Sequence, residues 1–153
     1  MGPLFPDAGA WPTGRITKYD RAVGDYDKAI DLNPKLAKAF RNRSVAYDRK
    51  GEHDKAIRDL TRVIDLNPDS PRAYCDRGIA RDHKGDYDHA IRDYSKAIAL
   101  DPKFAKAYHN RAVMHFHKRN YKSARADVNA AQALGYKVNP TFLELLRKAS
   151  PDN

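Results

Sequence analysis

The sequence has almost no cysteine and no long apolar run. Cys75 is the only cysteine among 153 residues, so no disulfide can form within the chain, and a reducing compartment, the cytoplasm, is the expected location. No apolar stretch approaches the roughly 20 residues that a membrane-spanning helix needs. The first residues carry no basic segment followed by an apolar core, which argues against a secretory signal.

Motifs of the common catalytic classes are also lacking. The chain has no glycine-rich phosphate loop and no GxSxG, HExxH or CxxC sequence. Histidines gather at His83, His109, His115 and His117, and of these we expect only His83 and His117, 34 positions apart, to lie near each other. No carboxylate or thiol completes a tetrahedral set with them. We therefore expect no catalytic residues, no cofactor and no metal.

The positive charge is distributed unevenly. The net charge is +9, yet residues 1–36 are balanced, whereas residues 105–153 carry nine basic and three acidic residues. A solvated charged surface is the simplest explanation. The alternative is an anionic partner, either an acidic protein or a nucleic acid that binds the basic C-terminal third.

A short phrase occurs three times along the chain. Residues 57–68 return as residues 91–102, 34 positions later, and residues 23–34 match both less closely. A fixed period of this length indicates stacked copies of one supersecondary unit. The expected divisions are an irregular tail (1–17) and one repeat domain (18–150), with a half repeat (18–36), three full repeats (37–70, 71–104 and 105–138) and a capping helix (139–150).

Each repeat is predicted to form two helices. Apolar and small residues stand three and four positions apart in each half, which is the spacing of one helical face. In the first repeat, Gly51 divides the halves and Pro68 ends the second half. Asn139 and Pro140 are typical of an N-cap and a first helical position, so they predict the start of the capping helix.

Three positions of the repeat carry a family resemblance: the fourth is aromatic, the eighth is small and the twentieth is alanine. The residues are Phe40, Tyr74 and Tyr108, then Ser44, Gly78 and Ala112, then Ala56, Ala90 and Ala124. With the Gly-Asp-Tyr, Ala-Ile and Leu-Asp-Pro elements of residues 74–102, they resemble the tetratricopeptide repeat, in arrays of the bacterial type. The resemblance implies an all-α fold, a right-handed solenoid of antiparallel helix pairs, and a non-catalytic scaffold that binds a protein or peptide.

The seventh and twenty-third positions are always charged. The seventh is arginine, where the family usually has leucine, and the twenty-third is aspartate. The pairs are Arg43 with Asp59, Arg77 with Asp93 and Arg111 with Asp127. Because the two positions should face each other across the helix pair, we predict three internal ion pairs. The alternative is a ladder of arginines that binds an anion.

The resemblance also implies a ligand site on the concave face of the first helices. Asp48 and Asp82 interrupt a surface that is otherwise basic with apolar patches, so an acidic protein or peptide is the expected partner. The predicted peptide-binding residues are Lys38, Arg41, Asn42, Val45, Arg49, Arg72, Cys75, Ile79, His83, Lys106, His109, Asn110, Val113, Phe116 and His117. Basic neighbours would lower the pKa of the Cys75 thiol, although a small packing residue is the simpler interpretation.

Asn42 and Asn110 each resemble the central asparagine of the carboxylate clamp, which grips C-terminal peptides of the Glu-Glu-Val-Asp type. The clamp also needs basic residues and an asparagine on neighbouring first helices. Beside Asn42, Asp76 stands where a basic residue is required; beside Asn110, Cys75 and Ile79 stand where lysine and asparagine are required. We therefore do not expect an intact clamp, although the basic residues can still hold a carboxylate.

The N-terminal half repeat has no first helix of its own. Proline and glycine residues between positions 3 and 14 prevent a regular helix there. Ala22, Tyr26 and Ala29 would therefore lack their usual partner. The segment 4–11 folded back, a second copy of the chain, or a preceding segment would cover them. A homodimer through the half repeat is one expected partner; a membrane is not.

Overall fold

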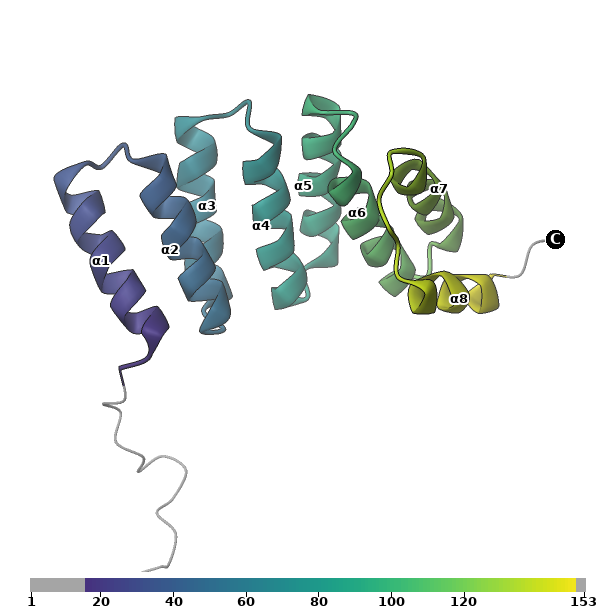
Figure 1. Cartoon of the computed structure of the whole chain (residues 1–153), viewed down its shortest axis with the longest axis horizontal. Coiled ribbons are helices and arrows are strands. Elements are labelled where there is room, and N and C mark those ends of the chain that lie inside the picture. The colour runs from purple at the N-terminus through teal and green to yellow at the C-terminus, as the bar shows by residue number, and fades with distance from the viewer. Residues whose placement is uncertain (1–15, 151–153) are drawn as a thin grey trace, which may run out of the picture.

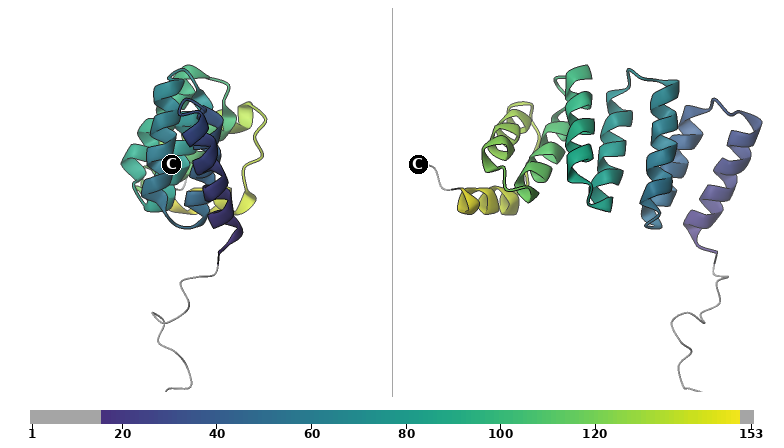
Figure 2. Two further views of the ribbon diagram at one scale, coloured as in Figure 1. Left: turned by 90° about the vertical axis from the view of Figure 1, so that its left-hand side faces the viewer. Right: turned by 180° about the vertical axis from the view of Figure 1, so that it is seen from behind.

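The computed structural model describes residues 16–150, which form eight α-helices and no strand (Figure 1). The helices are α1 (Lys18–Leu32), α2 (Ala37–Arg49), α3 (His53–Leu66), α4 (Pro71–Lys84), α5 (Tyr87–Leu100), α6 (Ala105–His117), α7 (Tyr121–Ala133) and α8 (Pro140–Ala149). From α1 to α7 they stand side by side in chain order, as the view from behind also shows (Figure 2). The predicted all-α solenoid is confirmed.

Helix α8 closes the row by crossing the direction of the other helices beside α7 (Figure 1). As predicted, it begins with Asn139 as N-cap, whose side chain accepts a hydrogen bond from the Thr141 N–H at 2.8 Å, followed by Pro140. Leu146 of this helix is buried against Ala124 and Val128 of α7. None of the described helices is long and apolar enough to cross a membrane.

The core alternates between small and large side chains. In the second repeat Gly78 lies directly against Tyr94, and a Cβ atom added at Gly78 would stand 2.6 Å from Tyr94 Cε1. Tyr94 is fully buried. The same two positions hold Ser44 with Leu60 in the first repeat and Ala112 with Val128 in the third. The smallest eighth residue therefore meets the largest partner, which keeps the helices close.

The three predicted ion pairs are present. Arg77 donates from Nε to Asp93 at 3.0 Å and from Nη2 to the other oxygen of Asp93 at 2.8 Å. Arg43 with Asp59 and Arg111 with Asp127 have the same two-pronged geometry, at 2.7 and 2.8 Å. The three aspartates are buried. We call Arg43, Arg77 and Arg111 the interior arginines.

Each interior arginine also reaches back to the preceding repeat. Its Nη1 donates to Asp27, Thr61 or Ser95, at 2.8, 3.2 and 2.9 Å respectively. These three acceptors occupy one position of successive second helices, 34 residues apart. One guanidinium therefore joins the two helices of its own repeat and the last helix of the previous one. The guanidinium can do so because its several N–H donors lie in one rigid plane, an arrangement that the single ammonium group of lysine lacks.

Candidate peptide-binding groove

The first helices of the three full repeats line one wall of the array. Helix α2 contacts α4, and α4 contacts α6. Between them lies a hollow of about 600 Å³. It is lined by Ser44, Val45, Asp48, Arg49, Leu60, Asp76, Ile79, Ala80, His83 and Lys106. We call this hollow the groove.

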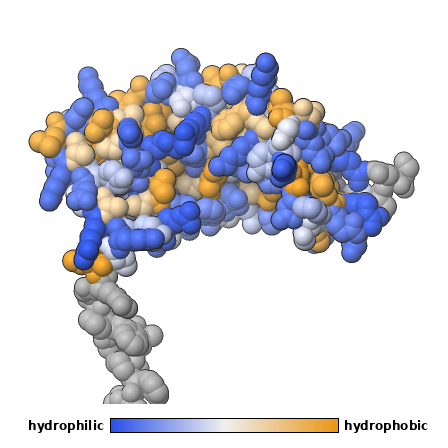
Figure 3. Space-filling view, viewed as in Figure 1, coloured by the Kyte–Doolittle hydropathy of each residue, from blue (hydrophilic) through white to orange (hydrophobic). Residues whose placement is uncertain are grey.

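The floor of the groove is apolar. Val45 is 52% exposed, Ile79 is half-buried, and Leu60 and Ala80 are buried beneath them. The face of the molecule in Figure 3 is mostly hydrophilic, with apolar residues in scattered patches. The exposed side chain of Val45 can therefore contact an apolar side chain of a ligand, and burial of the two apolar surfaces would favour binding.

Arg49 and Lys106 line the groove, and Lys38 and Arg72 lie at predicted wall positions of the same first helices. Lys38, Arg49, Arg72 and Lys106 are exposed, and none of them forms an ion pair within residues 16–150. We call these four the groove cations. Arg41 differs, because its Nε donates to Asp76 at 2.6 Å, so its charge is neutralised internally.

The predicted site residues differ widely in exposure. Besides the groove cations, Val45, His83 and His117 are exposed, whereas Cys75 is buried. The half-buried ones are Arg41, Asn42, Ile79, His109, Asn110, Val113 and Phe116.

On α6 the predicted wall is in contact with the C-terminal segment. The ring of His109 stacks on Tyr136 with 4.7 Å between centroids and meets the edge of Phe142 at 5.9 Å. Phe116 also contacts Phe142, at 5.5 Å. Burial lowers the pKa of His109, so its ring favours the neutral form. The path of residues 136–142 over α6 was not predicted from the sequence.

Cys75 is an interior residue. Its side chain is only 1% exposed, and Asn110 Nδ2 lies 3.9 Å from its sulfur. Burial raises the pKa of the thiol to about 11. The expectation that basic neighbours would lower this pKa is therefore wrong, because desolvation of the thiolate outweighs the attraction of Lys106 and Arg72.

The residues that depart from the carboxylate clamp make contacts of their own beside Asn42 and Asn110. Asp76, which stands where the clamp requires a basic residue, is held by Arg41. Asn110 faces the buried sulfur of Cys75.

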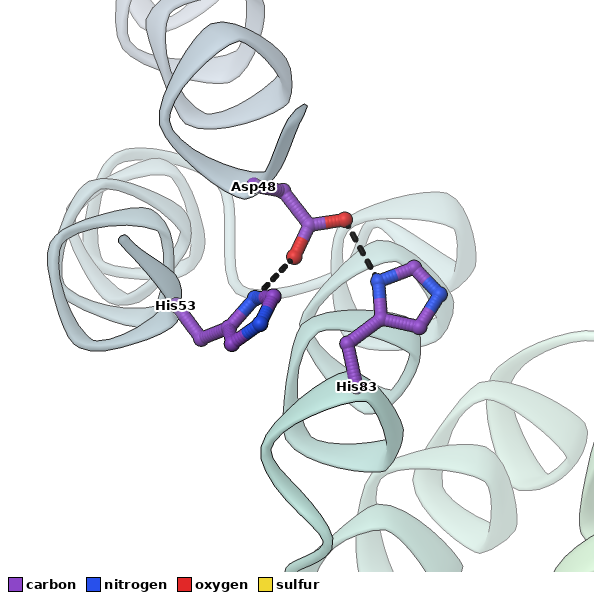
Figure 4. A group of neighbouring side chains, drawn as sticks. All are labelled: Asp48, His53 and His83. Atoms are coloured by element: carbon purple, nitrogen blue, oxygen red, sulfur yellow. Dashed lines mark hydrogen bonds and ion pairs between the residues drawn. The ribbon is translucent and has the colours of Figure 1, made fainter. Parts of the chain in front are cut away.

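Two residues of the groove lining, Asp48 and His83, form a cluster with His53 (Figure 4). Asp48 at the end of α2 is 2.7 Å from Nδ1 of His53, which begins α3, and 2.6 Å from Nδ1 of His83 near the end of α4. The sequence was expected to offer no carboxylate or thiol that completes a tetrahedral set with the histidines, and the structure brings one carboxylate, Asp48, to His83. His117 instead stacks on Tyr87, with 5.1 Å between ring centroids.

His53 was missed in the sequence, although a signal was present. The same repeat position is tyrosine at Tyr19, Tyr87 and Tyr121, so a histidine breaks an otherwise constant aromatic row. His53 also lies on a second helix, three residues before Ala56, whereas all the predicted wall residues lie on first helices. The cluster forms because the start of α3 lies beside the ends of α2 and α4 (Figure 4).

Solved structures of repeat proteins resemble the chain. MamA from Desulfovibrio magneticus RS-1 is 26% identical with a TM-score of 0.72, over 76% of this chain and 66% of that one. The Arabidopsis OM64 TPR domain is 28% identical with a TM-score of 0.70, over 74% and 96%. The first TPR of Spaghetti (RPAP3), bound to the HSP90 peptide SRMEEVD, is 26% identical with a TM-score of 0.68, over 74% and 89%. The chain thus spans slightly less than two thirds of that MamA chain.

Comparison with curated protein sequences gives no match. Three family profiles do match, all described as tetratricopeptide repeat, over residues 15–71, 46–108 and 94–126. Together they extend from α1 to α7 and agree with the fold of the solved structures. The chain belongs to the tetratricopeptide repeat proteins.

Proposed function

We propose that this protein is a non-catalytic scaffold that binds an acidic protein or peptide segment in the groove. The observation that carries the proposal is an apolar floor beside Arg49 and Lys106, together with the exposure of all four groove cations, which form no ion pair within residues 16–150. A cation without an internal partner keeps its charge available for a ligand, and the apolar floor supplies contact area. The hollow is lined by residues of three successive first helices, α2, α4 and α6, which suits an extended segment.

The proposed ligand combines acidic side chains with one apolar anchor. Carboxylates would contact Arg49 and Lys106 of the groove and the exposed Arg72 of α4, and an apolar side chain would lie on Val45 and Ile79. The peptide bound to the Spaghetti domain is itself acidic at its end. Because Asp76 neutralises Arg41 here, we propose that the carboxylates of this chain's ligand are read by the groove cations, without a clamp of the kind described above.

The test is a titration of labelled peptides that carry two or three acidic residues beside one leucine. We expect dissociation constants in the micromolar range that weaken as salt is raised. The triple variant Arg49→Glu, Arg72→Glu, Lys106→Glu should lose at least about tenfold in affinity, since three attractive contacts become repulsive.

A matched control reverses three exposed cations on the second helices: Arg62→Glu, Lys96→Glu, Lys122→Glu. It changes the net charge by the same amount but leaves the groove intact. Equal binding by both triple variants, each folded, would contradict the groove as the site.

Nucleic acid is the alternative ligand. The excess of positive charge in residues 105–153 favours it. The same titration with single-stranded RNA and duplex DNA distinguishes the two. Salt-sensitive binding of nucleic acid that both triple variants weaken equally, without binding of acidic peptides, would replace the peptide proposal.

We further propose that the chain self-associates through α1. None of the residues of α1 is buried, and Leu32 at its end is 88% exposed. Within the described residues α1 has a helical neighbour on one side only, α2. Sedimentation equilibrium should give a dimer that Tyr26→Glu converts to monomer, whereas Leu145→Glu on α8 leaves it dimeric. A wild-type monomer at micromolar concentration would reject this proposal.

A further inference from the structure

The cluster of Asp48, His53 and His83 brings three metal-ligating side chains together from three helices (Figure 4). One ligand atom from each side chain lies within 4.8 Å of the other two. The carboxylate is at the centre, with one oxygen toward each histidine, at 2.7 and 2.6 Å. The imidazole rings are 5.8 Å apart, tilted by 57°. Such convergence of two imidazoles on one carboxylate is the donor set that zinc accepts.

We propose that Asp48, His53 and His83 together bind one divalent transition-metal ion, with Zn²⁺ the first candidate. Zinc bonds to imidazole nitrogen at about 2.0–2.1 Å and to carboxylate oxygen at about 2.0–2.2 Å, so tetrahedral ligands stand roughly 3.3 Å apart. The three ligand atoms already lie within 4.8 Å of one another, so side-chain rotations would bring them to these separations. The ion would replace the hydrogen-bonding protons between the carboxylate and the two rings.

The site is accessible from the groove. Asp48 and His83 line the groove, and the exposed side-chain fractions are 17% for Asp48, 26% for His53 and 48% for His83. Three protein ligands leave a fourth coordination position for water or for a ligand group. A bound ion would face the groove and add positive charge to it. The inference does not depend on the proposed function, because metal alone can be titrated.

The charges near the cluster include a second carboxylate. Asp82 precedes His83 and interacts electrostatically with both Asp48 and His83. Lys84, which follows His83, donates to Asp54 at 2.6 Å and is thereby neutralised. Arg49 lines the same groove. The carboxylates of Asp48 and Asp82 favour a cation at the cluster, and the charge of Arg49 opposes them.

The repeat provides an internal comparison. One period later the equivalent residues are Asp82, Tyr87 and His117, so only the ligand at the position of His53 is missing. There Tyr87 stacks on His117 and leaves no third donor of the required kind. One period earlier the positions hold Tyr19 and Arg49. The complete set of ligands thus occurs at one repeat junction of the array.

The experiment uses the untagged full chain, freed of metal by chelation and titrated with Zn²⁺ by calorimetry. We expect one Zn²⁺ per chain and a rise in melting temperature, because the ion links α2, α3 and α4. Titration with Co²⁺ should give the visible absorption of a tetrahedral site.

Two variants remove a ligand without disturbing the fold. His53→Tyr introduces the residue that the other repeats use, and His83→Ala alters an exposed side chain. Each should weaken Zn²⁺ binding by more than about tenfold, a loss already typical of outer-shell changes. His89→Ala is the control, because His89 pairs with Asp86 alone at 2.8 Å. It should leave the binding unchanged.

A gain of binding gives the sharpest test. Tyr87→His should raise the stoichiometry to two Zn²⁺ per chain by completing the set with Asp82 and His117. No saturable binding by the wild-type chain at about 100 µM Zn²⁺, a level at which a three-ligand site would add measurable stability, would overturn the proposal. So would binding of equal strength in His53→Tyr, His83→Ala and the wild type. An unchanged single ion in Tyr87→His would contradict His53 as the deciding ligand.

Discussion

The interior arginines and the groove cations lie on the same three first helices but have opposite surroundings. Each interior arginine occurs at the same repeat position and holds a buried aspartate. Lys38, Arg72 and Lys106 also recur at one repeat position, but none of the four groove cations has an ion-pair partner within the described residues. One set of charges is therefore consumed by the fold, and the other is left for a ligand.

The difference teaches how to interpret charge in a repeat protein. All repeats share one backbone geometry, so a charged residue that recurs with a recurring partner serves that geometry. A position whose residue changes between repeats is not required by the geometry. Val45, Ile79 and Val113 occupy one such position, while Arg49, His83 and His117 occupy another. Variation on the groove wall is thus compatible with a role in ligand selection.

The largest effect is expected from removal of an interior carboxylate. Asp93 accepts hydrogen bonds from both Arg77 and Arg81, so Asp93→Ala leaves two guanidinium groups in the interior without their partner. We expect the free energy of unfolding to fall by about 3 kcal/mol or more. Arg77→Ala should cost less, because Arg81 still holds Asp93 at 2.8 Å. Chemical denaturation measures both.

The control for this prediction is Asp65→Ala, which removes an exposed carboxylate from α3. It should change the free energy of unfolding by no more than about 0.5 kcal/mol. If Asp93→Ala were as mild as Asp65→Ala, the recurring pairs would not be structural, and the contrast with the groove cations would disappear.

The next largest effect on the free energy of unfolding is expected at Gly78, a core position whose residue size depends on that of its partner, Tyr94. Gly78→Ala should destabilise the protein by about 1–3 kcal/mol, because the added Cβ meets Tyr94 at 2.6 Å and 2.9 Å. In a Tyr94→Leu background the same change should stabilise it by up to about 1 kcal/mol, since alanine is the better helix former. Thermal unfolding of the four proteins of this cycle tests the change of sign. The same sign in both backgrounds would refute the size coupling.

A smaller effect is expected from the groove cations. Arg72→Ala should alter the free energy of unfolding by less than about 0.5 kcal/mol, because Arg72 is exposed and forms no ion pair within the described residues. The same variant should weaken binding of the acidic peptides. A substantial loss of stability would show that Arg72 supports the fold and would blur the comparison.

The fold and the ion pairs were predictable because they repeat. Three copies at one spacing identify the helices, and the constant separation of Arg77 and Asp93 identifies their pairing. Contacts that occur once were not predictable. The packing of Tyr136 on His109 depends on the course of the chain after the last repeat, where the period no longer applies. The bond from Arg77 to Thr61 of the preceding repeat also requires the angle between neighbouring repeats.

The cluster of Asp48, His53 and His83 was only partly predictable from the repeat. His53 was visible as a departure from tyrosine, but its meaning depended on where α3 begins relative to α2 and α4. Helix starts are the least certain elements of a sequence-based prediction, because a shift of one residue turns a side chain by about 100° around the helix axis. Once Asp48 is seen between the two rings, the departure becomes informative.

The smallest effect is expected at Cys75, which occupies a position assigned to the groove wall but behaves as an interior residue. Its pKa is raised by burial from 9.0 to about 11. A raised pKa of an acidic group means that folding favours the protonated thiol. The associated stability is present below the unfolded pKa and is lost as pH rises through the window between 9.0 and about 11, because the unfolded chain releases the proton first.

Near neutral pH, therefore, Cys75 adds no pH dependence, and its thiol should react with alkylating reagents only as the protein unfolds. From pH 8 to pH 10 the wild type should lose more stability than Cys75→Ala, which lacks the titrating group. Denaturation midpoints of the two proteins across that range measure the difference, and quenched labelling in native buffer measures the protection. Rapid labelling of the native protein at pH 7 would contradict this assignment. It would show that Cys75 is accessible on the groove wall, as the groove cations are, and is not an interior residue.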